Sequence, residues 1–100
     1  MFVLLVELEA VHEKSGELDI LLRSLVTLAE HEPGIVFYAV QRPQGDYANF
    51  ILYEYYENKA AWETHLKFAP VQEKLKYFDS LLKKAPTITF CDVLSTTPVR

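Results

Sequence analysis

The sequence predicts an α+β fold in which a four-stranded antiparallel sheet carries helices on one face. Four short runs rich in β-branched and aromatic residues are separated by turn residues, and two longer stretches repeat apolar residues at helical spacing. These segments follow one another as strand, helix, strand, strand, helix, strand. This order predicts a single domain over residues 1–100, the commonest size for one domain.

The first half of the chain predicts a strand followed by a helix. FVLLVELEA, residues 2–10, is apolar at every position up to Glu7, a pattern typical of a strand covered on both faces. Ser15 is a suitable N-cap for the helix that follows. The apolar positions of this helix recur every three or four residues, at Leu18, Leu21, Leu22, Leu25, Leu28 and Ala29. We expect Glu32-Pro33-Gly34 to end it, since proline cannot continue the ladder of hydrogen bonds.

The middle of the chain predicts two strands joined as a hairpin. IVFYAVQ, residues 35–41, and NFILYEYY, residues 49–56, are separated by residues 42–46, whose proline and glycine favour a turn. A short connection between strands usually makes them antiparallel neighbours.

The second half predicts a bent helix and a last strand. Asn58 can cap a helix whose apolar stripe runs to Lys83-Lys84, and a bend is expected near Ala69-Pro70 because proline interrupts a helix. TITFCDVL, residues 87–94, is the final strand. The complete order βαββαβ is that of a ferredoxin-like fold.

The expected sheet has an open face that is too apolar for a monomer. If both helices cover one face, the other face exposes either one alternating set of strand residues, Val3, Leu5, Phe37 and Ala39, or the other, Leu4, Val6, Val36 and Val40. The simplest cover is a second copy packed sheet to sheet. We therefore predict a homodimer.

The composition of the chain limits the classes of partner and of metal site that we expect. A net charge of −4, with no basic cluster, disfavours nucleic acid and anionic membrane. The single cysteine, Cys91, excludes an internal disulfide and a multi-cysteine metal site, and it favours a reducing, cytoplasmic location. We expect Cys91 to be buried on its strand. The apolar N-terminus lacks a basic segment and a cleavage site, and no apolar run is long enough to cross a bilayer.

The candidate chemistry lies in the third strand and the second helix. His65 falls beside the apolar stripe of its helix and should point towards the sheet, where a histidine and a nearby Glu54 could relay a proton. Asn49, Tyr38 and Tyr53 could donate hydrogen bonds to a carbonyl or an enolate. The alternative is structural: His65 and Glu54 are satisfied by core contacts, Asn49 belongs to the turn, and the tyrosines fill the core. No metal-ligand spacing joins the histidines, and no nucleotide motif is present.

The sequence resembles the antibiotic biosynthesis monooxygenase (ABM) family over nearly its whole length. The resemblance rests on a pattern in the third strand and the helix after it, with a Glu-Pro-Gly turn upstream. Its residues are Phe50, Leu52, Tyr53, Glu54, Tyr56, Ala61 and His65, with Glu32-Pro33-Gly34 as the turn.

The resemblance implies a dimeric α+β barrel with a pocket between sheet and helices in each subunit. His65 matches the family's helix histidine, which points into the pocket, and Asn49 and Tyr53 match a pocket asparagine and aromatic. That places Asn49, Ile51 and Tyr53 on the pocket floor and Glu54 on the opposite face, as a structural or interface carboxylate. Pro70 replaces a second histidine found in many members. Leu75 replaces the iron ligand of the haem-degrading branch, so no cofactor and no metal is expected.

These expectations favour a cofactor-independent monooxygenase that oxidises a small hydrophobic phenolic, quinol or otherwise enolisable metabolite with O2. His65 and Asn49 would be catalytic, and Tyr38, Tyr53, Trp62 and Phe68 would contact the substrate. One alternative is a non-catalytic dimer that binds a small ligand. Another is an isomerase in which His65 transfers a proton without consuming oxygen.

Overall fold

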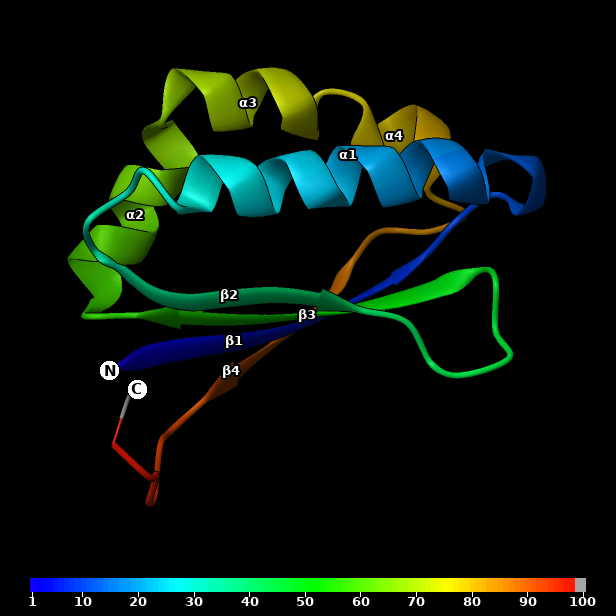
Figure 1. The fold of residues 1–100 in the computed structure, drawn as a ribbon. Coiled ribbons are helices and arrows are strands. Elements are labelled where there is room, and N and C mark those ends of the chain that lie inside the picture. The colour runs from blue at the N-terminus through cyan, green and yellow to red at the C-terminus, as the bar shows by residue number, and fades with distance from the viewer. Residues whose placement is uncertain (99–100) are drawn as a thin grey trace.

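The computed structural model describes residues 1–98 and has two layers, a sheet and a set of helices that covers one of its faces (Figure 1). The strands are β1 (Phe2–Glu9), β2 (Ile35–Gln41), β3 (Asn49–Tyr56) and β4 (Thr87–Cys91), in the spatial order β2-β3-β1-β4. All three pairings are antiparallel. The helices are α1 (Ser15–Ala29), α2 (Lys59–Lys67), α3 (Ala69–Leu75) and α4 (Phe78–Leu81), with a 3₁₀ turn, η1 (His12–Lys14), before α1. The predicted fold class is confirmed.

The core lies between the two layers because alternate strand residues and one stripe of α1 meet there. Leu18, Leu22 and Leu25 on α1 are at most 1% exposed. They face the buried strand residues Leu4, Val6, Leu8, Phe50, Leu52 and Tyr56. The period of two along the strands and the three- and four-residue spacing along α1 therefore produce one continuous apolar layer.

The start of α1 differs from the prediction. Ser15 is the first residue of the helix rather than its cap, and its hydroxyl donates a hydrogen bond to the carbonyl of Tyr47. The preceding 3₁₀ turn, His12–Lys14, leads the chain into the helix without a side-chain cap. Ser15 thus ties the helix to the loop between β2 and β3.

The second helical region is broken twice. The expected break occurs at Phe68, whose backbone is extended, and α3 restarts with Pro70 in its first turn, where a missing N–H costs nothing. The expectation of one continuous stripe beyond that point is wrong. The chain turns at Tyr77, and Leu82 is again extended and pairs with Ala10 as an isolated bridge. The Asn58 cap is confirmed, since its side chain accepts a hydrogen bond from the Ala61 amide at 2.9 Å.

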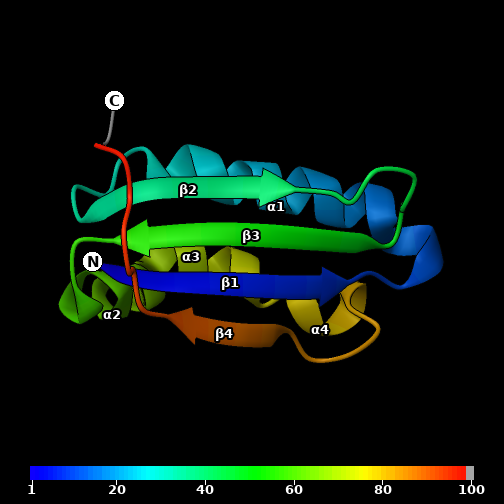
Figure 2. The same ribbon diagram turned by 90° about the horizontal axis from the view of Figure 1, so that it is seen from below.

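The last strand is shorter than predicted. It ends at Cys91 instead of residue 94, and residues 92–98 cross the open face of the sheet near the ends of β1, β3 and β2 (Figure 2). Cys91 is exposed, contrary to the expected buried position, because it pairs with Val3 on the open face of the sheet and β4 is an edge strand.

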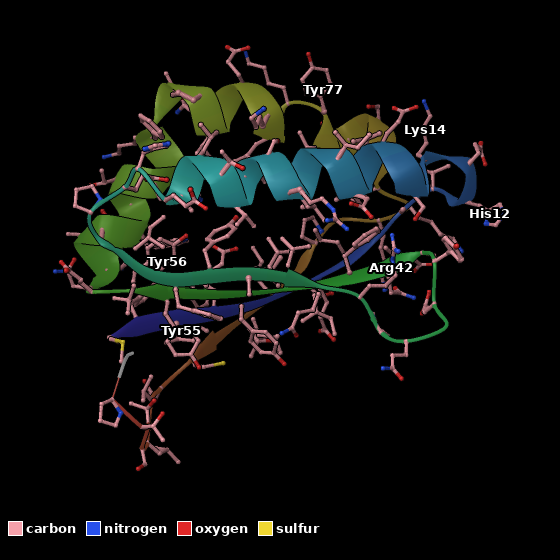
Figure 3. The ribbon with its side chains drawn as sticks, in the orientation of Figure 1. His12, Lys14, Arg42, Tyr55, Tyr56 and Tyr77 are labelled. Atoms are coloured by element: carbon pink, nitrogen blue, oxygen red, sulfur yellow. The ribbon has the colours of Figure 1, made fainter. Side chains whose placement is uncertain are left out.

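The open face carries the first of the two predicted apolar sets. Val3 and Leu5 pair with Tyr55 and Tyr53, and Phe37 also pairs with Tyr55. Figure 3 shows the alternation directly, since Tyr56 lies on the helix side of the sheet and Tyr55 on the other side. Phe37 is 53% exposed.

Within residues 1–98, no helix is long and apolar enough to cross a membrane.

Candidate functional site

A mostly apolar pocket of about 260 Å³ lies between the helix side of the sheet and the α2–α4 segment. Its lining contains four side chains with hydrogen-bonding groups, namely Tyr38, Glu54, Trp62 and His65. The remaining lining residues are Leu4, Val6, Leu25, Leu52, Leu66, Leu75, Phe78, Pro86 and Ile88. A small apolar cavity with a few convergent polar groups is the usual form of a small-molecule site.

Several other hollows in residues 1–98 are larger than this pocket, and the two described next contain no buried titratable group. One, of about 520 Å³, lies on the open face beside Thr96, Thr97 and Pro98. The other, of about 430 Å³, lies at the edge formed by α1 and β2, around the ion pair between Arg42 and Asp19. The pocket with His65 differs from these two because buried titratable side chains, His65 and Glu54, line it.

His65 is held by a carboxylate from the turn after α1. Its Nδ1 lies 2.7 Å from Glu32 Oε2, and the two side chains are only 5% and 11% exposed. A carboxylate accepts hydrogen bonds, so Nδ1 carries a proton, and Nε2 has a free lone pair whenever the ring is neutral. The contact joins residues 33 positions apart.

The Glu-Pro-Gly turn and α2 fit together at two adjacent points. Ala61 and His65 lie one helical turn apart on the same face of α2. Glu32 contacts His65, and Gly34 packs so closely against Ala61 that a Cβ on Gly34 would lie 2.6 Å from the Ala61 Cβ. The Glu57 amide also donates to the Gly34 carbonyl at 2.9 Å. The glycine is therefore needed for close approach, which brings Glu32 within reach of His65.

Four polar atoms of the lining residues have no hydrogen-bond partner. Within residues 1–98, no buried side-chain nitrogen or oxygen lacks a hydrogen-bond partner. In the same residues, His65 Nε2, Trp62 Nε1, the Tyr38 hydroxyl and Glu54 Oε2 make no hydrogen bond, so all four must be reached by solvent. The pocket is the space that their side chains share.

Glu54 is a buried carboxyl beside two buried tyrosines. Its Oε1 accepts a hydrogen bond from the Tyr56 hydroxyl at 2.5 Å, and the residue is 6% exposed. Burial raises the pKa of Glu54, while the hydrogen bond from Tyr56 and the charge of His65 oppose the shift. Burial, with the Glu54 charge as the next cause, also raises the pKa of both Tyr38 and Tyr56. Both tyrosines therefore remain neutral donors.

The structure corrects the predicted pocket floor. Glu54 pairs with Leu4 on one side and Tyr38 on the other and faces the helices, so its placement on the opposite face is wrong. Tyr53, with the opposite alternation, lies on the open face. Asn49 shares that alternation, and its amide donates to Asp46 Oδ2 at 2.7 Å in the turn before β3. Neither Asn49 nor Tyr53 is in the pocket.

Of the other three residues predicted to contact the substrate, two line the pocket and one does not. Tyr38 and Trp62 line the pocket as expected, and the Tyr38 ring lies 5.7 Å from that of His65. Trp62 packs at the mouth against Phe2 and Phe90, with ring centroids 5.2 and 5.4 Å away. Phe68, at the break between α2 and α3, lines a separate hollow of about 340 Å³ next to the Glu-Pro-Gly turn.

Sequence reasoning missed two partners, Glu32 and Tyr56. The Glu-Pro-Gly motif predicts a helix end and forms part of the family resemblance, but neither use reveals that its glutamate is the partner of His65. Tyr56 lies two residues after Glu54 on the same strand face, and this spacing was a usable signal for their hydrogen bond. No group of three potential metal ligands is found in residues 1–98.

Several solved structures share the fold of this protein. PA3566 from Pseudomonas aeruginosa superimposes with a TM-score of 0.87 at 22% identity, over 94% of each chain. Rv0793 from Mycobacterium tuberculosis gives 0.89 at 18%, over 97% of this chain and 98% of its own. A structure described as an antibiotic biosynthesis monooxygenase gives 0.88 at 19%, over 95% of this chain and all of its own. At these identities the likeness shows the fold alone.

The family is assigned by comparing the sequence with a family model. No curated protein sequence matches the chain. The family model for antibiotic biosynthesis monooxygenase matches residues 1–75, which include β1 to β3, the Glu-Pro-Gly turn and His65. The chain belongs to the antibiotic biosynthesis monooxygenase family.

Proposed function

We propose that this protein is a cofactor-independent monooxygenase that oxidises a small phenolic, quinol or otherwise enolisable metabolite with O2. The observation that carries the proposal is His65, whose Nδ1 is held by Glu32 and whose Nε2 opens into a mostly apolar pocket. Family membership and the neighbour described as a monooxygenase support the reaction class. His65 is the only member of the predicted catalytic pair that lines this pocket, because Asn49 lies outside it.

His65 serves as the base in the first step. Nε2 removes a proton from an acidic C–H of the substrate and forms an enolate, and Glu32 stabilises the imidazolium that results. The electron-rich anion transfers one electron to O2, and the substrate radical combines with superoxide to form a C–O bond. His65 returns its proton to the peroxide.

The second half of the reaction releases water. A second C–H proton leaves the same carbon, the O–O bond breaks, and hydroxide departs with a proton as water. In total a CH2 group and one O2 become a carbonyl group and one H2O, with the substrate as the only reductant. The aliphatic and aromatic lining favours this route because it excludes bulk water from the anion and strengthens the charge interactions around it.

The test is oxygen consumption with a small model anthrone whose CH2 group lies next to two aromatic rings. We expect one O2 to be consumed per ketone formed, and a product that carries one oxygen atom from ¹⁸O2. Substrate conversion without O2 uptake would instead identify an isomerase. Ligand binding with no conversion would identify a binding protein.

The open face of the sheet supports the homodimer as part of this proposal. Phe37 is 53% exposed beside Tyr55 in an edge-to-face contact, and the same face carries Leu5 and Tyr53. Apolar side chains gathered on a sheet face are the usual core of an interface between copies.

The predicted cytoplasmic location rests only on the single cysteine, Cys91, and stays a prediction.

Phe37→Asp is expected to shift the protein from dimer to monomer, because it places a charge on the apolar face of the sheet. Sedimentation velocity at micromolar concentration should show the molar mass falling by about half. Ile20→Asp is the matched control, since Ile20 is 72% exposed on α1, on the other layer of the molecule. A wild-type protein that sediments as a monomer would contradict the dimer.

A further inference from the structure

Two polar side chains lie next to each other on the pocket floor. Tyr38 on β2 and Glu54 on β3 are directly paired in the sheet, and both face the helices. The Glu54 charge is one cause of the raised pKa of Tyr38, after burial, so the two groups are close enough to interact. The mechanism proposed above assigns neither of them a role.

One atom of each side chain is available to a ligand. Glu54 Oε1 is occupied by the Tyr56 hydroxyl, while Oε2 has no partner within residues 1–98. The Tyr38 hydroxyl is likewise without a partner there. A carboxylate oxygen accepts a hydrogen bond and a neutral phenol donates one. Together they present one acceptor and one donor to the same space.

We infer that Glu54 and Tyr38 form a hydroxyl-binding subsite that selects neutral hydroxylated aromatic ligands and rejects carboxylates. A ligand hydroxyl donates to Glu54 Oε2 and accepts from the Tyr38 hydroxyl, which satisfies both groups at once. An ether can satisfy only Tyr38, and an unsubstituted ring satisfies neither. The inference rests on the proposed function for the pocket it uses, but it concerns binding and requires no turnover.

The charges around the pocket explain the rejection of anions. Glu54 lies in the lining, Glu32 lies directly behind His65, and none of the lining residues is Lys or Arg. A ligand carboxylate would therefore be desolvated near two carboxyl groups without a cation to pair with it. This electrostatic pattern favours a neutral ligand, and the free oxygen of Glu54 favours one that brings a hydroxyl proton.

The test is calorimetric titration under nitrogen with four probes that share one ring system: 1-naphthol, 1-methoxynaphthalene, naphthalene and 1-naphthoate. We expect 1-naphthol to bind about tenfold more tightly than 1-methoxynaphthalene, the usual size of the discrimination from one hydrogen bond to a charged group. Naphthalene should bind more weakly still, and 1-naphthoate weakest of all.

Two variants assign the preference to the subsite. Glu54→Gln keeps an oxygen for the Tyr56 hydroxyl but replaces Oε2 by a donor, so it should lower the ratio of 1-naphthol to 1-methoxynaphthalene affinity by about tenfold and improve 1-naphthoate binding. Tyr38→Phe should weaken both oxygen-bearing neutral probes relative to naphthalene. Glu7→Gln, which removes an exposed carboxylate from β1, should leave every ratio unchanged.

The outcomes separate this inference from the monooxygenase proposal. Equal affinities for the four probes, or a Glu54→Gln ratio equal to that of the wild type, would overturn the subsite. Because each ratio is measured within one protein, a variant that folds less well still gives a valid comparison. If the ratios are as expected but no oxygen is consumed with any substrate, the subsite stands and the oxygenation proposal fails.

Discussion

His65→Ala is expected to lower kcat for oxygen consumption by at least about 100-fold, the lower end of the contribution of a positioned general base. The imidazole is the one group of the pocket that combines an accessible lone pair with a carboxylate to stabilise its protonated form. Removing it takes away the positioned base that accepts the substrate proton. The measurement is the initial rate of O2 uptake with the model anthrone, at saturating substrate.

Because Glu32 positions His65, a substitution at Glu32 should lower kcat less than His65→Ala does. Glu32→Gln keeps a polar partner for Nδ1, but the amide can donate as well as accept, so it no longer fixes the proton on Nδ1. We expect a loss of about 10–100-fold, the range given by removing the hydrogen-bond partner of a metal-ligating histidine, since Glu32 orients His65 in the same way. The loss should fall on kcat more than on KM, because Glu32 does not line the pocket.

Folding must be separated from chemistry in this series. His65→Ala leaves the Glu32 carboxylate, which is 11% exposed, without its partner, and an unpaired buried charge is destabilising. The double variant Glu32→Gln with His65→Ala removes that charge and should fold more stably than His65→Ala alone while remaining inactive. Tyr53→Phe, on the open face, should keep wild-type turnover. Full turnover in a folded His65→Ala protein would exclude the proposed base.

The sequence predicted most of the fold because its periodicities are strong. The leucines of α1 recur on one face, and the strand runs are bounded by proline, glycine and asparagine. The second break in the α2–α4 region was not predictable in this way. Helix α4 likewise ends at Leu81, because Leu82 is extended and pairs with Ala10, a contact between segments that are far apart in the sequence.

The face of β3 shows where periodicity alone fails. Alternation divides the strand into two sets, and each set mixes apolar residues with one polar residue, Asn49 or Glu54. Nothing in the pattern decides which set is buried. The buried set is the one that contains the carboxyl group, and the hydrogen bond from Tyr56 to Glu54 offsets part of the cost of burying it. Family analogy favoured the wrong face because it placed Asn49 in the pocket.

The partner of His65 was hidden for a related reason. Glu32 and His65 belong to different elements, and only the packing of α2 on the Glu-Pro-Gly turn brings them together. The motif that ends α1 therefore has a second role, in which its glutamate orients the histidine and its glycine allows the approach. This double role can be tested through stability, without any substrate.

Gly34→Ala is expected to destabilise the protein by about 1–3 kcal/mol, the usual cost of overpacking a tight contact. Its new Cβ would lie 2.6 Å from the Ala61 Cβ, a separation that real side chains do not adopt, and 3.6 Å from the Ala61 Cα, which is ordinary contact. The clash therefore comes from one methyl group. Urea unfolding followed by circular dichroism gives the free energy of unfolding. Gly16→Ala is the control, because no atom lies within 4 Å of the added methyl group.

Ala61→Gly should rescue Gly34→Ala, because it removes the methyl group that the new side chain meets. Alone, Ala61→Gly should cost about 1 kcal/mol, the difference in helix propensity between the two residues. The double variant should be more stable than the sum of the single effects predicts, with a coupling energy of about 1 kcal/mol or more. The same restoration is expected in O2 uptake, since the turn that carries Glu32 returns to its place beside His65. Additive losses in stability would show that Gly34 and Ala61 do not set this contact, and that Glu32 is positioned by other means.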